Sequence, residues 1–118
     1  MPYLLMIIEP PGQREARGVE AGREAYDRML AFAGELKQRG VLLGVESLVS
    51  SNQATRVEVR GGRTSMVDGP FAETKEMIGG FFLLDVGDRE QALAIAAECP
   101  AASWCSVEVR ETGPCWMH

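Results

Sequence analysis

The stretch "VDGPFAETKEMIGGFFLLDV", residues 67–86, joins a charged turn to a continuous apolar run. Asp68, Gly69 and Pro70 are turn residues, because Pro fixes φ, Gly tolerates positive φ and Asp bonds to nearby backbone. The run 79–86 is apolar at almost every position, which is typical of a strand covered on both faces. Such a strand needs helices on one face and a second layer on the other. This stretch therefore predicts a layered protein of mixed α and β structure.

The regions on either side supply the other layers. Apolar residues alternate or run together in strand-like segments, and they recur every three or four residues in helical ones. Gly61-Gly62 predicts a tight hairpin turn, and Asp88 with Gln91 has the spacing of a helix-capping box. We expect strands at 3–9, 41–49, 54–60, 64–67, 79–86 and 106–110, and helices at 20–39 and 88–99.

This order predicts an α+β, ferredoxin-like sandwich, an antiparallel sheet with two helices on one face. The apolar stripe expected on the first helix contains Tyr26, Met29, Leu30, Ala33, Leu36 and Lys37. Phe32 lies off this stripe and is expected at an edge or against a partner. Because the strands 3–9 and 79–86 are apolar on both faces, a second copy is expected to cover the other face of the sheet. The sequence therefore predicts a homodimer.

Composition sets the class of protein. The 118 residues fit one domain, expected at 1–111 and followed by a C-terminal tail at 112–118. The net charge is −5 and no basic run is present, which argues against nucleic acid or an anionic membrane as a partner. The apolar run 3–8 is too short to span a bilayer and lacks the features of a signal peptide.

The cysteines point to a reducing compartment. Cys99, Cys105 and Cys115 are an odd number in a chain without an export signal, which predicts reduced thiols and a cytoplasmic location. Cys99 and Cys105 are expected as small apolar core residues. The cysteine spacings lack the close pairs of structural zinc sites, and no phosphate-binding loop is present. Neither a metal nor a cofactor is expected.

The segment "VDGPFAETKE", followed by "GGFFLLDV", a helix ending in "CPAA" and a strand "SVEVR", resembles the DGPF-motif branch of the YCII-related family. The resemblance covers nearly the whole chain and implies a dimeric α+β barrel built from ferredoxin-like protomers. It also implies an association with sigma factors, and, from the YCII type, a catalytic pair of a first-helix His and an Asp near the DGP position. The sole histidine here is His118, so Asp68 would act without that partner.

Asp68 and Phe71 each allow two interpretations. The Asp68 carboxylate can accept backbone N–H bonds in the turn or cap a short helix near Pro70. Alternatively, it can act as a general base at the mouth of a cleft. Phe71 is either a core plug or an apolar wall for a small ligand.

Four other side chains complete the predicted site. Glu46 interrupts an apolar strand, so it faces either solvent on an edge or a polar cavity near Asp68. Lys75 either pairs with a surface carboxylate or holds the carboxylate of a substrate. Tyr26 and Met29 are expected near the same pocket, between sheet and helices.

Two functions follow from this site. The first is the binding of a small organic ligand in a cleft beside the DGPF turn, with proton transfer in a small organic acid (isomerisation or elimination) as the chemistry one carboxylate supports. The second is a non-catalytic module linked to sigma-factor regulation, with an interaction surface outside the cleft.

Overall fold

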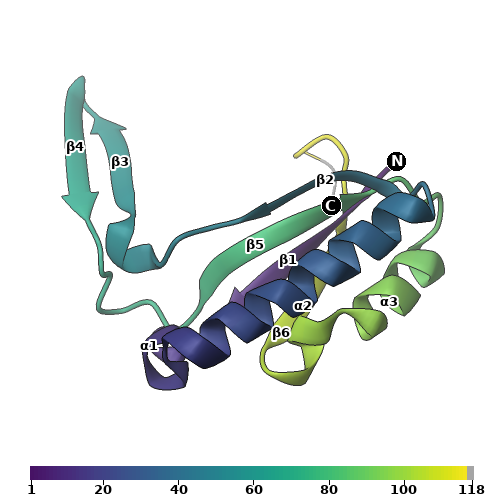
Figure 1. Cartoon of the computed structure of the whole chain (residues 1–118). Coiled ribbons are helices and arrows are strands. Elements are labelled where there is room, and N and C mark those ends of the chain that lie inside the picture. Colours follow the sequence, from purple (N-terminus) through teal and green to yellow (C-terminus); the bar gives the residue numbers. More distant parts are fainter. Residues whose placement is uncertain (117–118) are drawn as a thin grey trace.

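The computed structural model describes residues 1–116, so the end of the tail, including His118, lies outside the described part of the chain. Figure 1 shows the helices and strands in the colours of the sequence. In chain order the elements are β1 (Tyr3–Glu9), α1 (Gln13–Arg17), α2 (Val19–Gln38), β2 (Leu42–Ser47), the 3-10 turn η1 (Ser51–Gln53), β3 (Thr55–Arg60), β4 (Arg63–Asp68), β5 (Met77–Leu84), α3 (Arg89–Glu98), η2 (Pro100–Ser103) and β6 (Ser106–Glu111).

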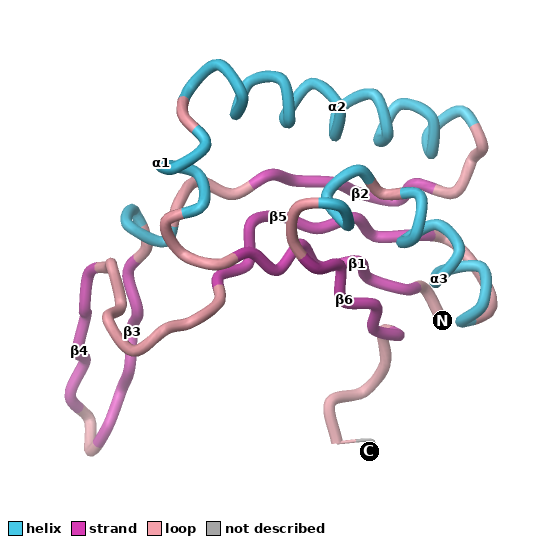
Figure 2. Tube along the Cα trace, turned by 90° about the horizontal axis from the view of Figure 1, so that it is seen from below, coloured by secondary structure: helices cyan, strands magenta, loops and turns pink. Residues whose placement is uncertain are grey.

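The main sheet has the strand order β2-β5-β1-β6, and each neighbouring pair is antiparallel. Both long helices, α2 and α3, pack on one face of this sheet (Figures 1 and 2). This is the ferredoxin-like arrangement, with the hairpin β3–β4 inserted between β2 and β5. The predicted α+β sandwich, an antiparallel sheet with two helices on one face, is confirmed.

The core lies between the sheet and the two helices. In β1 burial alternates with the side-chain period of a strand, so that Tyr3, Leu5 and Ile7 are buried against the helices. The prediction for Phe32 was wrong, because this side chain is 5% exposed and its ring meets that of Phe82 edge to face at 5.4 Å. The buried side of α2 is therefore rotated towards Phe32 and away from the exposed Tyr26 and Leu30.

The start of α3 was predicted by neighbouring residues in the sequence, whereas the helix α1 was not predicted. The Asp88 carboxylate accepts the Gln91 backbone N–H at 2.8 Å, as the capping spacing predicts. The helix α1 was not expected from the sequence, because a helix of five residues has almost no intrinsic stability. It is bounded by Gly12 and Gly18, both at positive φ, which allow the chain to turn sharply before and after it.

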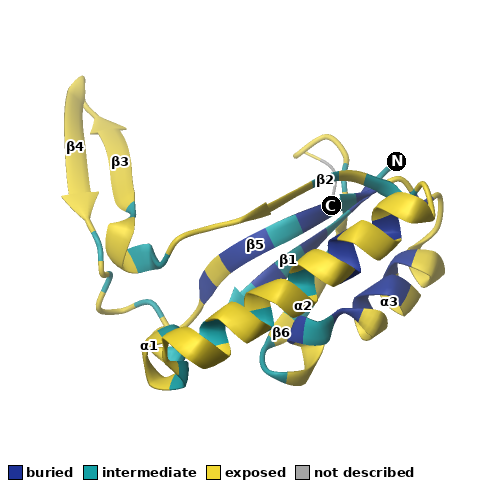
Figure 3. Ribbon diagram, viewed as in Figure 1, coloured by how far each residue is buried: buried dark blue, intermediate teal, exposed yellow. Residues whose placement is uncertain are grey.

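The hairpin β3–β4, residues 55–68, is here called the arm. It forms its own two-stranded sheet and projects away from the rest of the molecule (Figure 1). Every residue of both strands is exposed (Figure 3). Its tip is the predicted tight turn at Gly61-Gly62, where both residues have positive φ.

The sheet face away from α2 and α3 is here called the bare face, because no element of residues 1–116 covers it. Alternation and register assign its side chains. Its apolar members are Leu4, Met6, Ile8, Ile78, Phe81 and Leu83. Within residues 1–116, no helix combines the length and apolar character needed to cross a membrane.

Candidate functional site

A cavity of about 390 Å³ lies between α2 and the sheet. Its lining is mixed, with apolar side chains along α2 and the sheet, and with polar groups that include Glu9 at the end of β1 and Arg14 on α1. The apolar lining includes Ile7, Met29, Leu30, Ala33, Val45 and Phe82, and the polar lining includes Glu9, Arg14, Tyr26 and Ser47. Cavities of this size and composition are typical of sites for small organic molecules.

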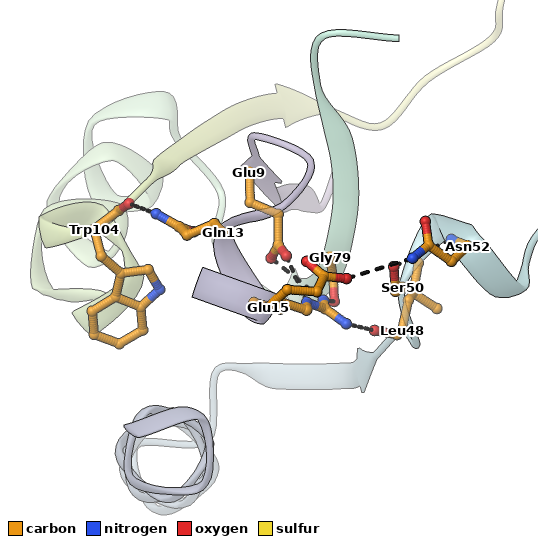
Figure 4. A network of polar contacts seen from close by, with 9 residues as sticks. Glu9, Gln13, Glu15, Leu48, Ser50, Asn52, Gly79 and Trp104 are labelled. Carbon is orange, nitrogen blue, oxygen red and sulfur yellow. Dashed lines mark hydrogen bonds and ion pairs between the residues drawn. The ribbon is translucent and has the colours of Figure 1, made fainter. Parts of the chain in front are cut away.

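The polar end is built around a buried carboxylate. Glu9 continues the inward side of β1 and is 7% exposed. Arg14 meets it with two nitrogens, Nε at 2.6 Å from Oε1 and Nη2 at 3.4 Å from Oε2. The guanidinium also donates to the backbone oxygens of Leu48, at 2.7 Å, and Gly79, at 3.4 Å (Figure 4). A buried carboxylate requires such a partner, because desolvation penalises an unpaired charge.

Two glycines of β5 allow close packing beside the cavity, one against the ion pair and one against the β2 backbone. A Cβ at Gly79 would overlap Oε2 of Glu9 and lie 2.9 Å from Nη2 of Arg14, and a Cβ at Gly80 would lie 2.7 Å from the Glu46 oxygen. Only glycine allows such close approach of backbone to neighbouring atoms. The register of β1 on β5 also shifts here, between Ile7 and its successor. Gly79 is therefore required by packing around Glu9 and Arg14, and Gly80 by the close approach of the β2 backbone.

Trp104 forms one wall of the cavity. Its backbone oxygen accepts a 2.6 Å hydrogen bond from Nε2 of Gln13, which ties the η2 turn to α1 (Figure 4). The guanidinium carbons of Arg17 and Arg28 lie 5.4 Å and 5.1 Å from the centroid of the Trp104 ring, within the range of cation–π attraction. The wall at Trp104 is therefore aromatic, and two positive charges lie on its ring without lining the cavity themselves.

The cysteines near the cavity do not supply a reactive thiolate. Burial is the main reason that the pKa of the Cys105 thiol is raised to about 11, and the neighbouring Glu9 and Cys99 contribute to this shift. Burial also raises the pKa of Cys99, whose Sγ lies 3.9 Å from Sδ of Met29. Both thiols therefore stay protonated near neutral pH. All three cysteines are free, and Cys99 packs in the core as predicted.

Three of the predicted site residues line this cavity: Tyr26, Met29 and Glu46. Tyr26 is half-exposed on α2, and Met29 packs against the core. Glu46 is exposed on the edge strand β2, as its solvent-facing interpretation expects. Because Glu46 pairs in register with Phe81, its side chain belongs to the bare face and its backbone lines the cavity.

The other predicted residues lie at the base of the arm. The Asp68 carboxylate accepts a 2.7 Å hydrogen bond from the Thr55 hydroxyl, so it neither bonds to the backbone of its turn nor caps a helix. The Phe71 ring lies under the Arg56 guanidinium, 3.7 Å from its centroid. Lys75 is exposed and lines none of the hollows found in the described chain.

The DGPF turn, residues 68–71, holds the two strands of the arm together at their base and is here called the DGPF clasp. The Gly69 N–H donates to the Ala54 oxygen at 2.7 Å, and a Cβ at Gly69 would overlap the Ser51 oxygen, so the returning strand is held tightly against η1. Arg56 adds a 3.2 Å hydrogen bond to the Thr74 hydroxyl. These contacts join both strands of the arm to the segment that follows them.

Sequence reasoning missed Glu9, Arg14 and Trp104. One signal was available: alternation from Tyr3 assigns Glu9 to the buried side of its strand, where an acid needs a cationic partner. Nothing local identifies Arg14 as that partner, because it sits in a polar stretch with other charged residues.

Fold and cavity define a class of small α+β proteins, in which a ferredoxin-like sheet and its helices enclose a ligand-sized hollow. A profile of the YCII-related domain matches residues 1–113, so the chain belongs to the YCII-related family. It is also similar to a protein of Rhizobium meliloti (strain 1021) named "Uncharacterized protein R00369". The two are 40% identical over 112 residues, which are 93% of this chain and 90% of that protein.

Proposed function

We propose that this protein binds a small organic molecule in the cavity between α2 and the sheet. The observation that carries the proposal is the buried Glu9–Arg14 pair at the end of a hollow of about 390 Å³ that is lined by both apolar and polar groups. Apolar walls bind the body of a ligand, and a few fixed polar groups orient it.

The charge beside the cavity favours an anionic ligand. Arg17 and Arg28 lie over Trp104, and neither forms an ion pair with an acid among residues 1–116. A carboxylate approaching this wall would meet two guanidinium groups and an aromatic face. Arg14 would add little direct attraction, since Glu9 already neutralises it.

The test is thermal unfolding with a panel of small carboxylates and their uncharged amides, such as benzoate and benzamide. A ligand present at 100 times its Kd stabilises the folded state by about 2.7 kcal/mol. In a chain of this size, that raises the Tm by roughly 10 °C. We expect carboxylates to raise the Tm more than their amides.

A matched pair of variants locates the site. Leu30 lines the cavity and is 51% exposed, whereas Leu93 on α3 is 38% exposed and lines none of the hollows in the described chain. Leu30→Trp narrows the hollow and is expected to weaken binding at least tenfold, and Leu93→Trp is expected to leave it unchanged. Equal binding by both variants, or a panel without any stabilising compound, contradicts the proposal.

We further propose that the protein is a homodimer of the DGPF branch that acts in the cytoplasm. The apolar bare face supports a second copy as its cover, because soluble proteins rarely leave a large apolar patch exposed. The contiguous motif at 67–76 supports the branch. Three free thiols are in keeping with a reducing compartment.

A further inference from the structure

The molecule exposes more surface than a compact chain of its mass. Its radius of gyration is 16.1 Å, whereas a compact domain of this length has about 13.5 Å. Its accessible surface is 8204 Å², whereas a compact monomer of this mass exposes roughly 6,300 Å². The arm accounts for much of this difference, because none of its strand residues is buried (Figure 3).

An arm of this kind is not stable by itself. A lone two-stranded hairpin is marginal in water, and it normally needs another strand or layer to pack against. The arm contributes no residue to the core of the body. Another surface therefore has to supply the missing layer.

The two faces of the arm differ in chemistry. Cross-strand register places Val57 opposite Met66 and Val59 opposite Thr64 on one face. The three apolar members of this face, Val57, Val59 and Met66, are 59%, 58% and 69% exposed. The opposite face carries Arg56, Glu58, Arg60, Arg63, Ser65 and Val67. One face is thus suited to packing, and the other to solvent.

The arm is continuous with the bare face. A groove of about 460 Å³ at the base of the arm is lined by Leu48, Val49, Phe71 and Ile78, and the arm itself contributes Arg56 of its polar face. Ile78 belongs to the bare face as well, because it pairs with Ile8. Figure 2 shows the arm reaching past the sheet on the side away from α2. Whatever covers the bare face therefore lies beside the arm.

Charge favours a second copy of this chain as the partner. Residues 55–68 contain three arginines and two carboxylates, which give the arm a net charge of +1. Because the whole chain carries −5, the remaining residues carry a net charge of −6. The three arginines lie on the face opposite Val57, Val59 and Met66, so they would add long-range attraction to an acidic neighbouring copy and not contacts within the packed face.

The surface area agrees with an extensive contact between copies. Two separate copies expose more accessible surface than one compact globular protein of twice the mass. A dimer as compact as such a protein would bury roughly 5,900 Å² of this surface in total. This lies at the upper end of the range for obligate homodimers.

We propose that the arm is an intersubunit clamp, which packs its apolar face against the body of a second copy of this chain. The inference rests on the proposed homodimer and adds the element that holds it. The contact is reciprocal, because a two-fold axis gives each copy one arm that reaches across and one body that receives. The DGPF clasp fixes the direction in which the arm leaves its own body.

The test compares Val57→Lys with Val67→Lys. These two valines lie on opposite faces of the same hairpin and are 59% and 54% exposed. We expect Val57→Lys to raise the Kd of the dimer at least tenfold in sedimentation equilibrium, and Val67→Lys to change it less than threefold. Because both positions are exposed in the protomer, neither variant is expected to prevent folding.

A second measurement identifies what the arm touches. A sample mixing copies with ¹³C-labelled Met and Val methyl groups and unlabelled copies is expected to give isotope-filtered contacts from the Met66 methyl to the other copy. Contacts from the bare face but none from Met66, or equal Kd values for the two lysine variants, would overturn the clamp and leave the homodimer standing. A wild-type chain that stays monomeric at high concentration would overturn both.

Discussion

The strands β1 and β3 contrast the two regions of this molecule. In β1 every second side chain is buried, although the sequence is apolar from Tyr3 to Ile8, because helices lie on one of its faces. In β3 polar and apolar residues alternate from Arg56 to Arg60, yet every residue is exposed. Alternation therefore indicates a strand and its two faces, but burial depends on what the rest of the fold brings to them. The body supplies its own layers, and the arm does not.

The largest effect is expected in the core of the body. Leu36 on α2 is fully buried, so Leu36→Ala is expected to lower the free energy of unfolding by about 3 kcal/mol, through lost contacts and a cavity. Urea denaturation at fixed protein concentration measures this. The control is Leu30→Ala on the exposed side of the same helix, expected to change stability by under about 1 kcal/mol. If both variants lost the same free energy of unfolding, the distinction between buried and exposed positions on α2 would be wrong.

The next effect concerns the buried ion pair. Gly79→Ala introduces a Cβ into the space of Glu9 and Arg14, and displacing that pair is expected to lower the free energy of unfolding by about 2 kcal/mol. Gly87→Ala is the control, because a Cβ there meets no atom within 4 Å. The same denaturation experiment compares them. If Gly79→Ala is as stable as the wild type, the polar end of the cavity is looser than the body around it.

A smaller effect is expected from pH. Burial raises the pKa of Cys105 from 9.0 to about 11, so between these values the unfolded chain loses a proton that the folded chain keeps. The stabilisation is complete below pH 9 and is lost as pH rises towards 11. Allowing for partial exposure, the loss is about 1 kcal/mol. Cys105→Ala is expected to flatten this part of the stability profile, and Cys115→Ala, at an exposed position, to retain it.

The smallest effect is expected at the arm. Asp68→Asn keeps an acceptor for the Thr55 hydroxyl at an exposed site, so it is expected to change the free energy of unfolding by less than about 0.5 kcal/mol. It is also expected to leave the binding of carboxylates to the cavity unaltered, as measured by thermal shift. If Asp68→Asn no longer bound carboxylates, Asp68 would belong to the ligand-binding site. The proposal that the body binds the ligand without the arm would then be wrong.

Sequence reasoning predicted the features that depend on local chemistry. The cap from Asp88 to Gln91 and the turn at Gly61-Gly62 are formed by neighbours in the chain, so their spacing was sufficient. The phase of α2 was not local. Tyr26 and Leu30 continue one helical stripe and Phe32 with Leu36 another, and only the position of the sheet decides which is buried.

The candidate site was harder to predict for the same reason. Arg14 joins Glu9 across a turn and meets Leu48 and Gly79 from distant parts of the chain. The most distinctive motif in the sequence, the DGPF turn, pointed to Asp68 as a site residue, whereas its contacts in the structure hold the two strands of the arm together at their base. A conspicuous motif is not necessarily where a ligand binds.

The hydrogen bond from the Leu48 N–H to the Gly79 oxygen, at 2.9 Å, has a consequence for protein engineering. The chain leaves the body after β2 and returns to it at β5, at two points that are hydrogen-bonded to each other. The residues between these points are therefore an insertion between two neighbouring strands. A short reverse turn joining these points would leave the sheet order intact. Other loops or peptides could be inserted between the same two strands, so this position makes the protein a candidate scaffold for displaying them.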